Sequence, residues 1–244
     1  MQLGKAIPCV WLPRHEEARI VVDSFGASLN YIQHITHYPL LPHMVNEIYQ
    51  RIEGREPVQS GSLILLLAII AMTTHVWVLR DEVEDERFLF WSSTQAHTQT
   101  SLWIKATYAV LNASQEGAAL ALETIQGVMI LSFVICNLEG YSLRYRSLLS
   151  TALLLGREQG LHRIDHESNS AMANTTKAEM RRRLWWYLIA TDWFVFVSHN
   201  CIEVREEITN SSEQARSGKV WWPRCKRSSS QHAPHDSQQT PTSQ

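Results

Sequence analysis

One stretch of this sequence, residues 63–79, is apolar on nearly every side that a helix would present. Such a helix is stable in water only where other elements cover it, in the middle of a helical protein. The stretch also contains Thr73, Thr74 and His75, and it falls short of the roughly 20 apolar residues that span a bilayer. We therefore predict a central buried helix over residues 62–80, with a membrane span as the less favoured alternative.

Apolar residues in the rest of the chain recur at steps of three and four, the spacing of one helix face. Pro13 is suited to open a first helix, whose apolar stripe continues to Ile32. No segment alternates apolar and polar residues over the length of a strand. The pattern predicts an all-α fold, a multi-helix bundle of about seven helices. The further helices are expected over residues 44–52, 88–111 with a break at 92–101, 118–138, 142–159 and 176–198.

The charge balance argues against DNA binding by this chain alone. It has 22 basic and 24 acidic residues, a net charge of −2, whereas phosphate binding favours a basic excess. The four cysteines lie far apart with no Cys-x-x-Cys pair, so near neighbours cannot build a zinc ribbon. Cys225, His232 and His235 match no established zinc spacing. We expect no metal and no cofactor on this chain.

The C-terminal part of the chain is polar. Residues 228–244 contain one aliphatic residue, Ala233, and cannot bury enough surface to offset their ordering entropy. We expect residues 200–244 to form a polar, disordered tail. The basic patch at Arg224, Lys226 and Arg227 is read as part of this solvated tail, with nuclear import as the alternative.

Catalytic patterns are missing from the sequence. There is no Ser-His-Asp order, glycine-rich phosphate loop or His-Glu-x-x-His motif, so no catalytic residue is predicted and the chain is expected not to be an enzyme. A metal-dependent helical-bundle enzyme remains an alternative, with the acidic run at residues 81–86 as its one candidate metal site. A helical protein that binds a small molecule is the other alternative.

Two motifs carry a family resemblance. Residues 144–163 read RYRSLLSTALLLGREQGLHR and residues 179–194 read EMRRRLWWYLIATDWF, with a polar loop between them. In order and spacing they resemble the middle homology region of fungal zinc-cluster transcription factors, the domain typified by the xylanolytic-activator regulator. The resemblance extends more loosely to residues 12–17 and 38–42. It implies a regulatory domain over residues 12–199, preceded by a leader at residues 1–11.

The resemblance implies a function in regulating transcription by RNA polymerase II, in the nucleus. In full-length members a zinc cluster of six closely spaced cysteines binds DNA, and this chain lacks it. The chain also departs from the family after His199, and Trp193 stands where many members carry arginine. We expect an incomplete domain, truncated at its C-terminus. Its partners would be other proteins, a second copy or a small-molecule inducer, with DNA reached only through the absent cluster and no membrane contact.

Within the first motif, Gly160 is a helix stop, and Leu161, His162 and Arg163 follow it. Basic side chains at this point favour the C-terminal end of the helix dipole. Capping is therefore the role expected for His162 and Arg163.

The second motif opens with a capping-box pattern, Thr176 to Glu179, followed by three arginines. We expect Arg181, Arg182 and Arg183 to pair with nearby carboxylates, with nucleic-acid contact as the less favoured reading.

Later in the same motif, Trp185 and Trp186 are expected to pack in the core, with an inducer pocket as the alternative. Asp192 lies among apolar residues, and an unpaired buried carboxylate is costly. We therefore predict that Asp192 is buried or half-buried and paired with Arg144, Arg146 or Arg157.

Overall fold

The structure is a computed structural model that describes residues 10–78, 93–114, 121–167, 169 and 173–216. For residues 198–216 it describes the backbone alone. The chain divides into two compact units, residues 1–197 and 198–244. The acidic run at 81–86, the tail from residue 217 and the residues Cys225, His232 and His235 lie outside the described part.

The described residues form helices and the segments that connect them, with no strand, which confirms the all-α bundle. Eight α-helices are described instead of about seven, because the first predicted helix is divided at Leu29, where φ is −128°. The elements are α1 (His15–Ser28), α2 (Asn30–Gln33), the 3₁₀ turn η1 (Tyr38–Leu40), α3 (Leu41–Glu53), α4 (Ser60–Val78), α5 (Ser93–Ser114), α6 (Leu122–Glu139), α7 (Leu143–Glu158), the 3₁₀ turn η2 (Leu161–Arg163) and α8 (Thr176–Arg216).

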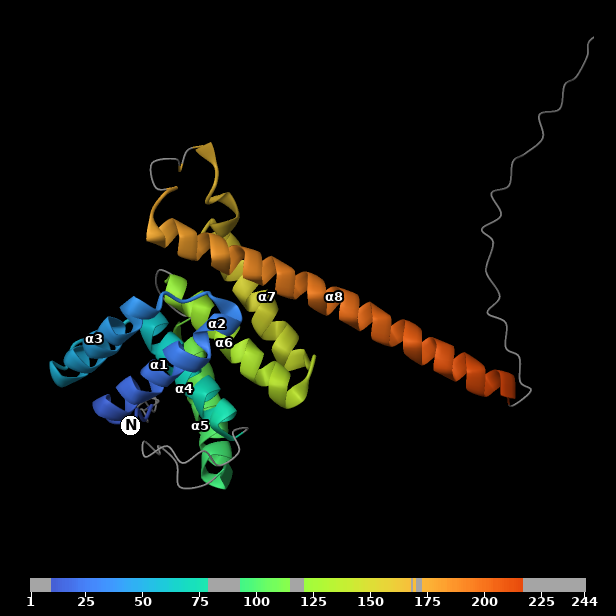
Figure 1. The fold of residues 1–244 in the computed structure, drawn as a ribbon, viewed down its shortest axis with the longest axis horizontal. Helices are drawn as coiled ribbons and strands as arrows, with labels where there is room; N and C mark the ends of the chain where they lie inside the picture. The colour runs from blue at the N-terminus through green and yellow to red at the C-terminus, as the bar shows by residue number, and fades with distance from the viewer. Residues whose placement is uncertain (1–9, 79–92, 115–120, 168, 170–172, 217–244) are drawn as a thin grey trace, which may run out of the picture. The chain divides into compact units, whose positions relative to one another are not determined.

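Helix α4 lies at the centre of the first unit, as its composition predicts. It packs against α1, α3, α5 and α6 (Figure 1). Its residues from Ile64 to Met72 are at most 2% exposed. The windows Ser60–Trp77 and Leu122–Glu139 are both long and apolar enough to cross a membrane, yet 72% and 61% of them are buried inside the protein. Burial in the bundle therefore accounts for the apolar character of α4 and α6.

Helices α4 and α6 approach each other closely at Gly127. A methyl group built there would lie 2.8 Å from Ile64 Cγ2 and 2.9 Å from the backbone nitrogen of Leu65. Real Cβ atoms do not come this close to a neighbouring backbone, so only glycine fits at this point. The distance between the two central helices thus depends on the hydrogen atom that glycine carries in place of a side chain.

The expected break at residues 92–101 is wrong, since α5 runs without interruption through Ser93–Ser114. Thr98 Oγ1 donates to the carbonyl of Thr94, and Thr100 Oγ1 donates to that of Ala96. These hydroxyls bond to carbonyls one turn back along their own helix, so polar residues here do not require an interruption.

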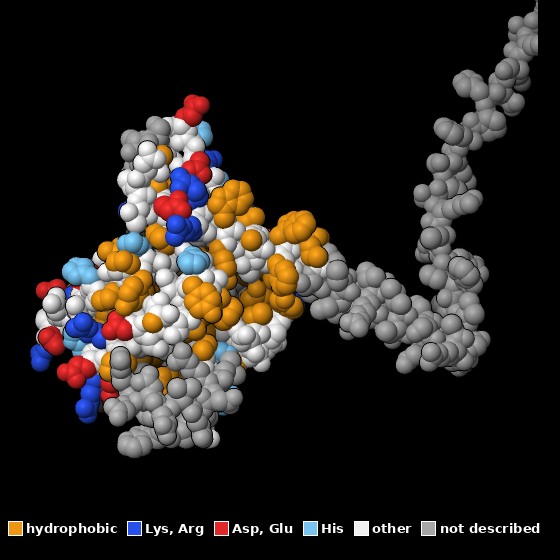
Figure 2. All heavy atoms as spheres, viewed as in Figure 1, with side chains coloured by type: hydrophobic (Ala, Val, Ile, Leu, Met, Phe, Trp, Pro, Cys, Tyr) orange, Lys and Arg blue, Asp and Glu red, His pale blue; other side chains and the backbone are white. Residues whose placement is uncertain are grey.

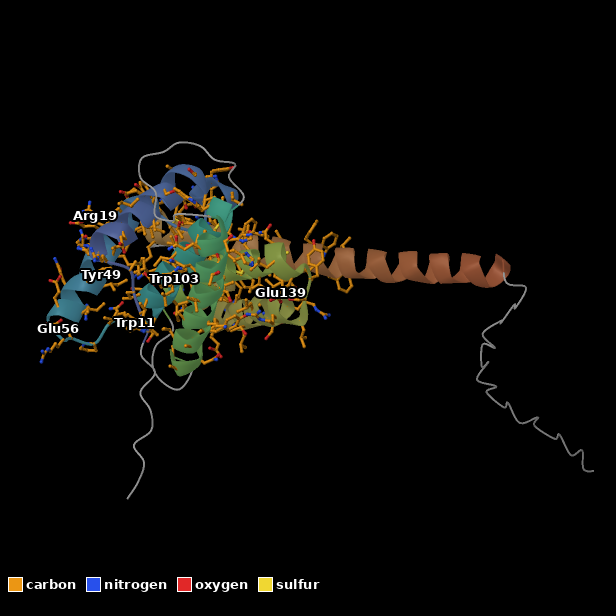
Figure 3. All side chains as sticks on the ribbon, turned by 90° about the horizontal axis from the view of Figure 1, so that it is seen from below. Trp11, Arg19, Tyr49, Glu56, Trp103 and Glu139 are labelled. Atoms are coloured by element: carbon orange, nitrogen blue, oxygen red, sulfur yellow. The ribbon has the colours of Figure 1, made fainter. Side chains whose placement is uncertain are left out.

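The segment before α1 is held by α3. Tyr49 Oη donates to the carbonyl oxygen of Pro13 at 2.6 Å, and the ring of His15 stacks on the Tyr49 ring at 4.8 Å between centroids. Burial, with a smaller contribution from the charge of Glu17, raises the pKa of Tyr49 to about 12. The Tyr49 phenol therefore stays neutral and available as a donor at neutral pH. Figure 3 labels Tyr49 on α3.

Helix α8 is longer than the sequence pattern indicates. The sequence predicts that it ends near residue 198, whereas the backbone is helical to Arg216. The helix contains no glycine or proline, and the next glycine in the chain is Gly218. Extending a helix needs only one further residue to be ordered for each hydrogen bond gained, so a polar sequence without breakers can continue it.

Candidate functional site

The family-like motifs meet where α7 ends and α8 begins. Gly160 has φ +68°, in the left-handed region where glycine is free of Cβ strain, and it ends α7 as expected. Leu161, directly after it, is fully buried and anchors the turn η2. The first motif is therefore a helix end that turns the chain back into the core.

Helices α7 and α8 pack through small and aliphatic side chains. A methyl at Gly156 would lie 3.3 Å from Leu188 Cδ1 and 3.7 Å from the Trp185 ring. Leu184 and Leu188 of α8 are both completely buried. The absence of a side chain at Gly156 lets α8 bring Leu188 against α7.

The aliphatic run of α7 contributes unevenly to this contact. Leu153 and Leu155 are buried, whereas Leu154 between them is 57% exposed. Successive residues on a helix point in different directions, so one of three consecutive leucines faces solvent here.

Arg181 ties the two helices together. Its Nη2 donates to the carbonyl oxygen of Gln159 at 2.6 Å, at the C-terminal end of α7. The last carbonyls of a helix have no partner within it, and a guanidinium is a favourable donor to them. The side chains of His162 and Arg163 were expected to cap this end, but both residues are exposed and no hydrogen bond of the described region joins their side chains to α7. Arg181 takes that role from the following helix.

Arg182 and Arg183 form an ion-pair cluster, as predicted, whereas the same prediction for Arg181 is wrong, since it bonds to a carbonyl and no ion pair of the described residues includes it. Arg182 donates from Nη2 to Asp165 Oδ1 at 2.7 Å and from Nη1 to Glu179 Oε2 at 2.6 Å. Arg183 Nε donates to Glu179 Oε1 at 2.8 Å. Figure 2 shows acidic and basic side chains side by side over this end of the unit. The two arginines are thereby occupied with carboxylates of the same chain, which argues against their contacting phosphate groups.

The ion pairs lower the pKa values of the two acids that they involve. Hydrogen bonds from Arg182 lower the pKa of Asp165, and hydrogen bonds from Arg183 and then Arg182 lower that of Glu179. A carboxyl whose folded pKa is lowered stabilises the fold above its unfolded pKa, and this contribution is lost as the pH falls through the folded value.

We therefore expect Arg182→Gln to lower the melting temperature by about 1–3 °C at neutral pH, since exposed pairs contribute little. The difference should shrink as the pH is lowered toward about 2, because the carboxyls then become protonated in both proteins. Thermal unfolding followed by circular dichroism at both pH values checks this. Arg146→Gln, which removes an exposed arginine of α7, is the control; an equal effect from it would contradict the pairing.

The tryptophans of the second motif differ in their surroundings. Trp185 is half-buried and packs against the core, and its ring lies 5.8 Å from the His162 ring between centroids. Trp186 is 63% exposed, so the expectation that it packs in the core is wrong. Consecutive residues of a helix face directions about 100° apart, so only one of the pair can face α7.

An exposed apolar stripe continues along α8 from Trp186. Trp193, Phe194 and Phe196 are each at least 60% exposed. Figure 2 shows orange hydrophobic side chains following this part of the helix. The Phe194 ring lies 6.3 Å from the Tyr141 ring between centroids, and most of the stripe is left exposed by the described residues.

The prediction for Asp192 is also wrong. The residue is exposed, and the ion pairs of the described residues do not include it. Arg144 pairs instead with Glu139. The face of α8 that enters the core carries Leu184, Leu188 and Val195, and Asp192 lies outside that stripe. A carboxylate among apolar neighbours in sequence needs no partner when it reaches water.

The helix start differs by one residue from the predicted capping box. Thr175 Oγ1, not that of Thr176, accepts a hydrogen bond from the backbone of Ala178 at 3.1 Å. Glu179 turns to the arginines instead of the cap. Three residues after Thr175 stands alanine and not glutamate, so the capping-box pattern pointed to Thr176 and missed the threonine that caps the helix.

Three residues of this site were not predicted from the sequence: Gln159, Asp165 and Gly156. Asp165 lies 17 residues before Arg182, a separation that gives no periodic signal. Gln159 contributes a backbone carbonyl, which every residue possesses. Only the small size of Gly156 inside a helix hinted at a close contact.

A cavity of about 840 Å³ opens between η1, α3, α4, α6 and the first turns of α8. Its volume falls in the range of small-molecule sites. Its lining includes Lys177 and Arg181 on α8 and the apolar side chains of Leu41, Met44 and Leu65. Within the described residues, no three His, Cys, Asp or Glu side chains are grouped so as to hold a metal ion.

The chain resembles known transcription factors over most of its length. The probable transcription factor lepB of Aspergillus flavus is 28% identical over 202 residues, which are 80% of this chain and 35% of that protein. Transcription factor TAS2 of Pyricularia oryzae is 26% identical over 189 residues, 76% of this chain and 24% of that protein. The agnestins biosynthesis cluster transcription factor AgnL11 of Paecilomyces divaricatus is 27% identical over 190 residues, 75% of this chain and 27% of that protein.

The chain thus spans about a quarter to a third of the length of these relatives. No solved structure is significantly similar to it. Residues 30–201 match the family model of the fungal specific transcription factor domain, and this match contains both motifs of the α7–α8 site. The chain therefore belongs to the fungal specific transcription factor domain family.

Proposed function

We propose that this bundle is a non-catalytic regulatory module that acts in the nucleus and passes its conformational state to the DNA-binding part of a transcription factor. The family match over residues 30–201 is the observation that carries the proposal. In the zinc-cluster factors that the sequence resembles, DNA contact is made by a separate zinc cluster. We propose the same division here, with zinc bound by that cluster and not by the bundle.

The arginines of the site support a role without direct DNA contact. Arg182 and Arg183 are bound to carboxylates of the same chain, and Arg181 is bound to a carbonyl of α7. The net charge of −2 adds no attraction to phosphate. The basic residues most visible in the sequence therefore serve to join α7, its following loop and α8.

A reporter assay tests the proposal. The chain is inserted between an unrelated DNA-binding domain and an unrelated activation domain, and a flexible linker of equal length replaces it in the reference fusion. A regulatory module coupled to its neighbours should change reporter output by about fivefold or more, the usual lower range of allosteric coupling. The measurement is made at equal protein levels.

A Gly127→Ala fusion, in which the bundle is destabilised, should behave like the linker reference. Equal output from the intact chain and the linker would contradict the regulatory proposal. Sequence-specific DNA binding by the isolated chain, seen as a gel shift that a competing random sequence does not remove, would contradict the division of roles.

A further inference from the structure

The 840 Å³ cavity has two chemically different walls. One wall is the start of α8, where Lys177 and Arg181 are four residues apart and therefore lie on the same side of the helix. The other wall is apolar and comes from η1, α3, α4 and α6. The apolar side chains of the lining include, besides Met180 of α8, those of Leu40, Leu41, Met44, Leu65 and Leu122.

The basic wall carries charge that no carboxylate of the described residues neutralises. Arg181 bonds to the neutral carbonyl of Gln159, and its buried Nε has no hydrogen-bond partner. The ion pairs of the described region include neither Arg181 nor Lys177. The next two arginines, Arg182 and Arg183, are by contrast both paired with carboxylates. Within the described part of the chain, the cations that face the cavity are thus the ones without acidic partners.

The negative charges that line the cavity are weaker than the positive charges of Lys177 and Arg181. Glu47 lines it, but its carboxylate is bound to Arg51 at 2.9 Å. Glu123 in the first turn of α6 is the remaining acid of the lining, and His37 and His43 complete its titratable groups. The dipole of α8 adds positive potential at the helix start, on the side of Lys177. Electrostatics therefore favours an anion at the α8 wall.

We infer that this cavity binds a small amphipathic carboxylic acid. Its carboxylate would lie between Lys177 and Arg181, and its apolar part would cover Met44 and Leu65. A site of this kind, mostly apolar with a few convergent polar groups, is typical for small organic ligands. The inference rests on the proposed function in one respect: the ligand would act on the regulatory module through Arg181, which also holds the end of α7.

The test uses three probes that share one tail: octanoate, octanol and octylammonium. The full chain is labelled with carbon-13 at its methionine methyl groups and titrated with each probe by NMR. Met44 and Met180 line the cavity, whereas Met72 and Met129 are at most 1% exposed and lie outside its lining. Octanoate should shift the signals of the first pair and leave those of the second pair in place.

Charge-assisted hydrogen bonds should make octanoate bind roughly tenfold more tightly than octanol. Lys177→Gln, at an exposed position, should weaken octanoate binding roughly threefold and leave octanol unchanged. Arg146→Gln, which removes an exposed arginine outside the cavity lining, should change neither affinity.

Tighter binding of octylammonium than of octanoate would assign the cavity to cations at Glu123 and overturn the inference. Equal affinity for octanoate and octanol, or no shift of Met44 and Met180 with any probe, would overturn it as well. The readout is binding to the isolated chain, so such a failure would leave the reporter result untouched. Conversely, octanoate binding together with equal output in the reporter assay would retain the ligand site and reject the regulatory role.

Discussion

Gly127→Ala is expected to lower the free energy of unfolding by about 2 kcal/mol or more, although alanine normally stabilises a helix interior by about 1 kcal/mol relative to glycine. The new methyl group would lie 2.8 Å from Ile64 Cγ2, 2.9 Å from Leu65 N and 3.0 Å from the Ile64 carbonyl carbon. Two of these three atoms belong to the backbone of α4, which cannot move aside as a side-chain tip can. The substitution therefore forces the two central helices apart.

Denaturant unfolding followed by circular dichroism measures this effect. Gly156→Ala is the matched control, because it is also a glycine-to-alanine change inside a helix that packs on a neighbour. There the new methyl would meet Leu188 Cδ1 at 3.3 Å, the end of a flexible side chain, so we expect a change within about 1 kcal/mol. A Gly127→Ala protein as stable as the parent would show that α4 and α6 do not pack at this distance.

Leu188→Ala is expected to destabilise the bundle by about 2–5 kcal/mol, the cost of a cavity left by a buried leucine. Leu188 is completely buried and lies against α7 at Gly156. Its removal takes away much of the apolar contact that joins α8 to the rest of the first unit. The loss should appear as a lower midpoint of denaturation with an unchanged slope.

Trp186→Ala provides the comparison, since it removes a larger side chain two residues away on the same helix. Trp186 is 63% exposed, so its truncation should change stability by about 0.5 kcal/mol. A cost for Trp186→Ala similar to that for Leu188→Ala would mean that the tryptophan is covered in the folded protein. The orientation of α8 described here would then be wrong.

Much of the fold could be predicted from the sequence because it depends on local pattern. The apolar run at residues 63–79 had to be covered, and α4 is the central helix. The order and spacing of the motifs at 144–163 and 179–194 indicated the family, and the match over residues 30–201 confirms it. The pairing of Arg182 and Arg183 followed from the usual preference of arginines in the first turns of a helix for nearby carboxylates, from which Arg181 departs.

The predictions for Trp186 and Asp192 are wrong about the side of α8 on which each side chain lies. Trp186 and Asp192 were placed in or near the core because their sequence neighbours are apolar, but the core-facing stripe of α8 passes through Leu184, Leu188 and Val195. Several phases of the helix fit an apolar run of this kind, and only the docking against α7 selects one. The uninterrupted α5 depended on threonine hydroxyls bonding within the helix, an arrangement that composition does not reveal.

The sequence by itself determined that the chain is helical, which helix is central and to which family it belongs, because these follow from periodicity, burial demand and motif order along the chain. Only the tertiary structure decided that Arg181 holds the carbonyl of Gln159, that α4 meets α6 at Gly127, and that Lys177 and Arg181 face a cavity. Each of these depends on the distance between segments far apart in the chain. Such distances are set by the packing of all the helices together, and no single segment encodes them.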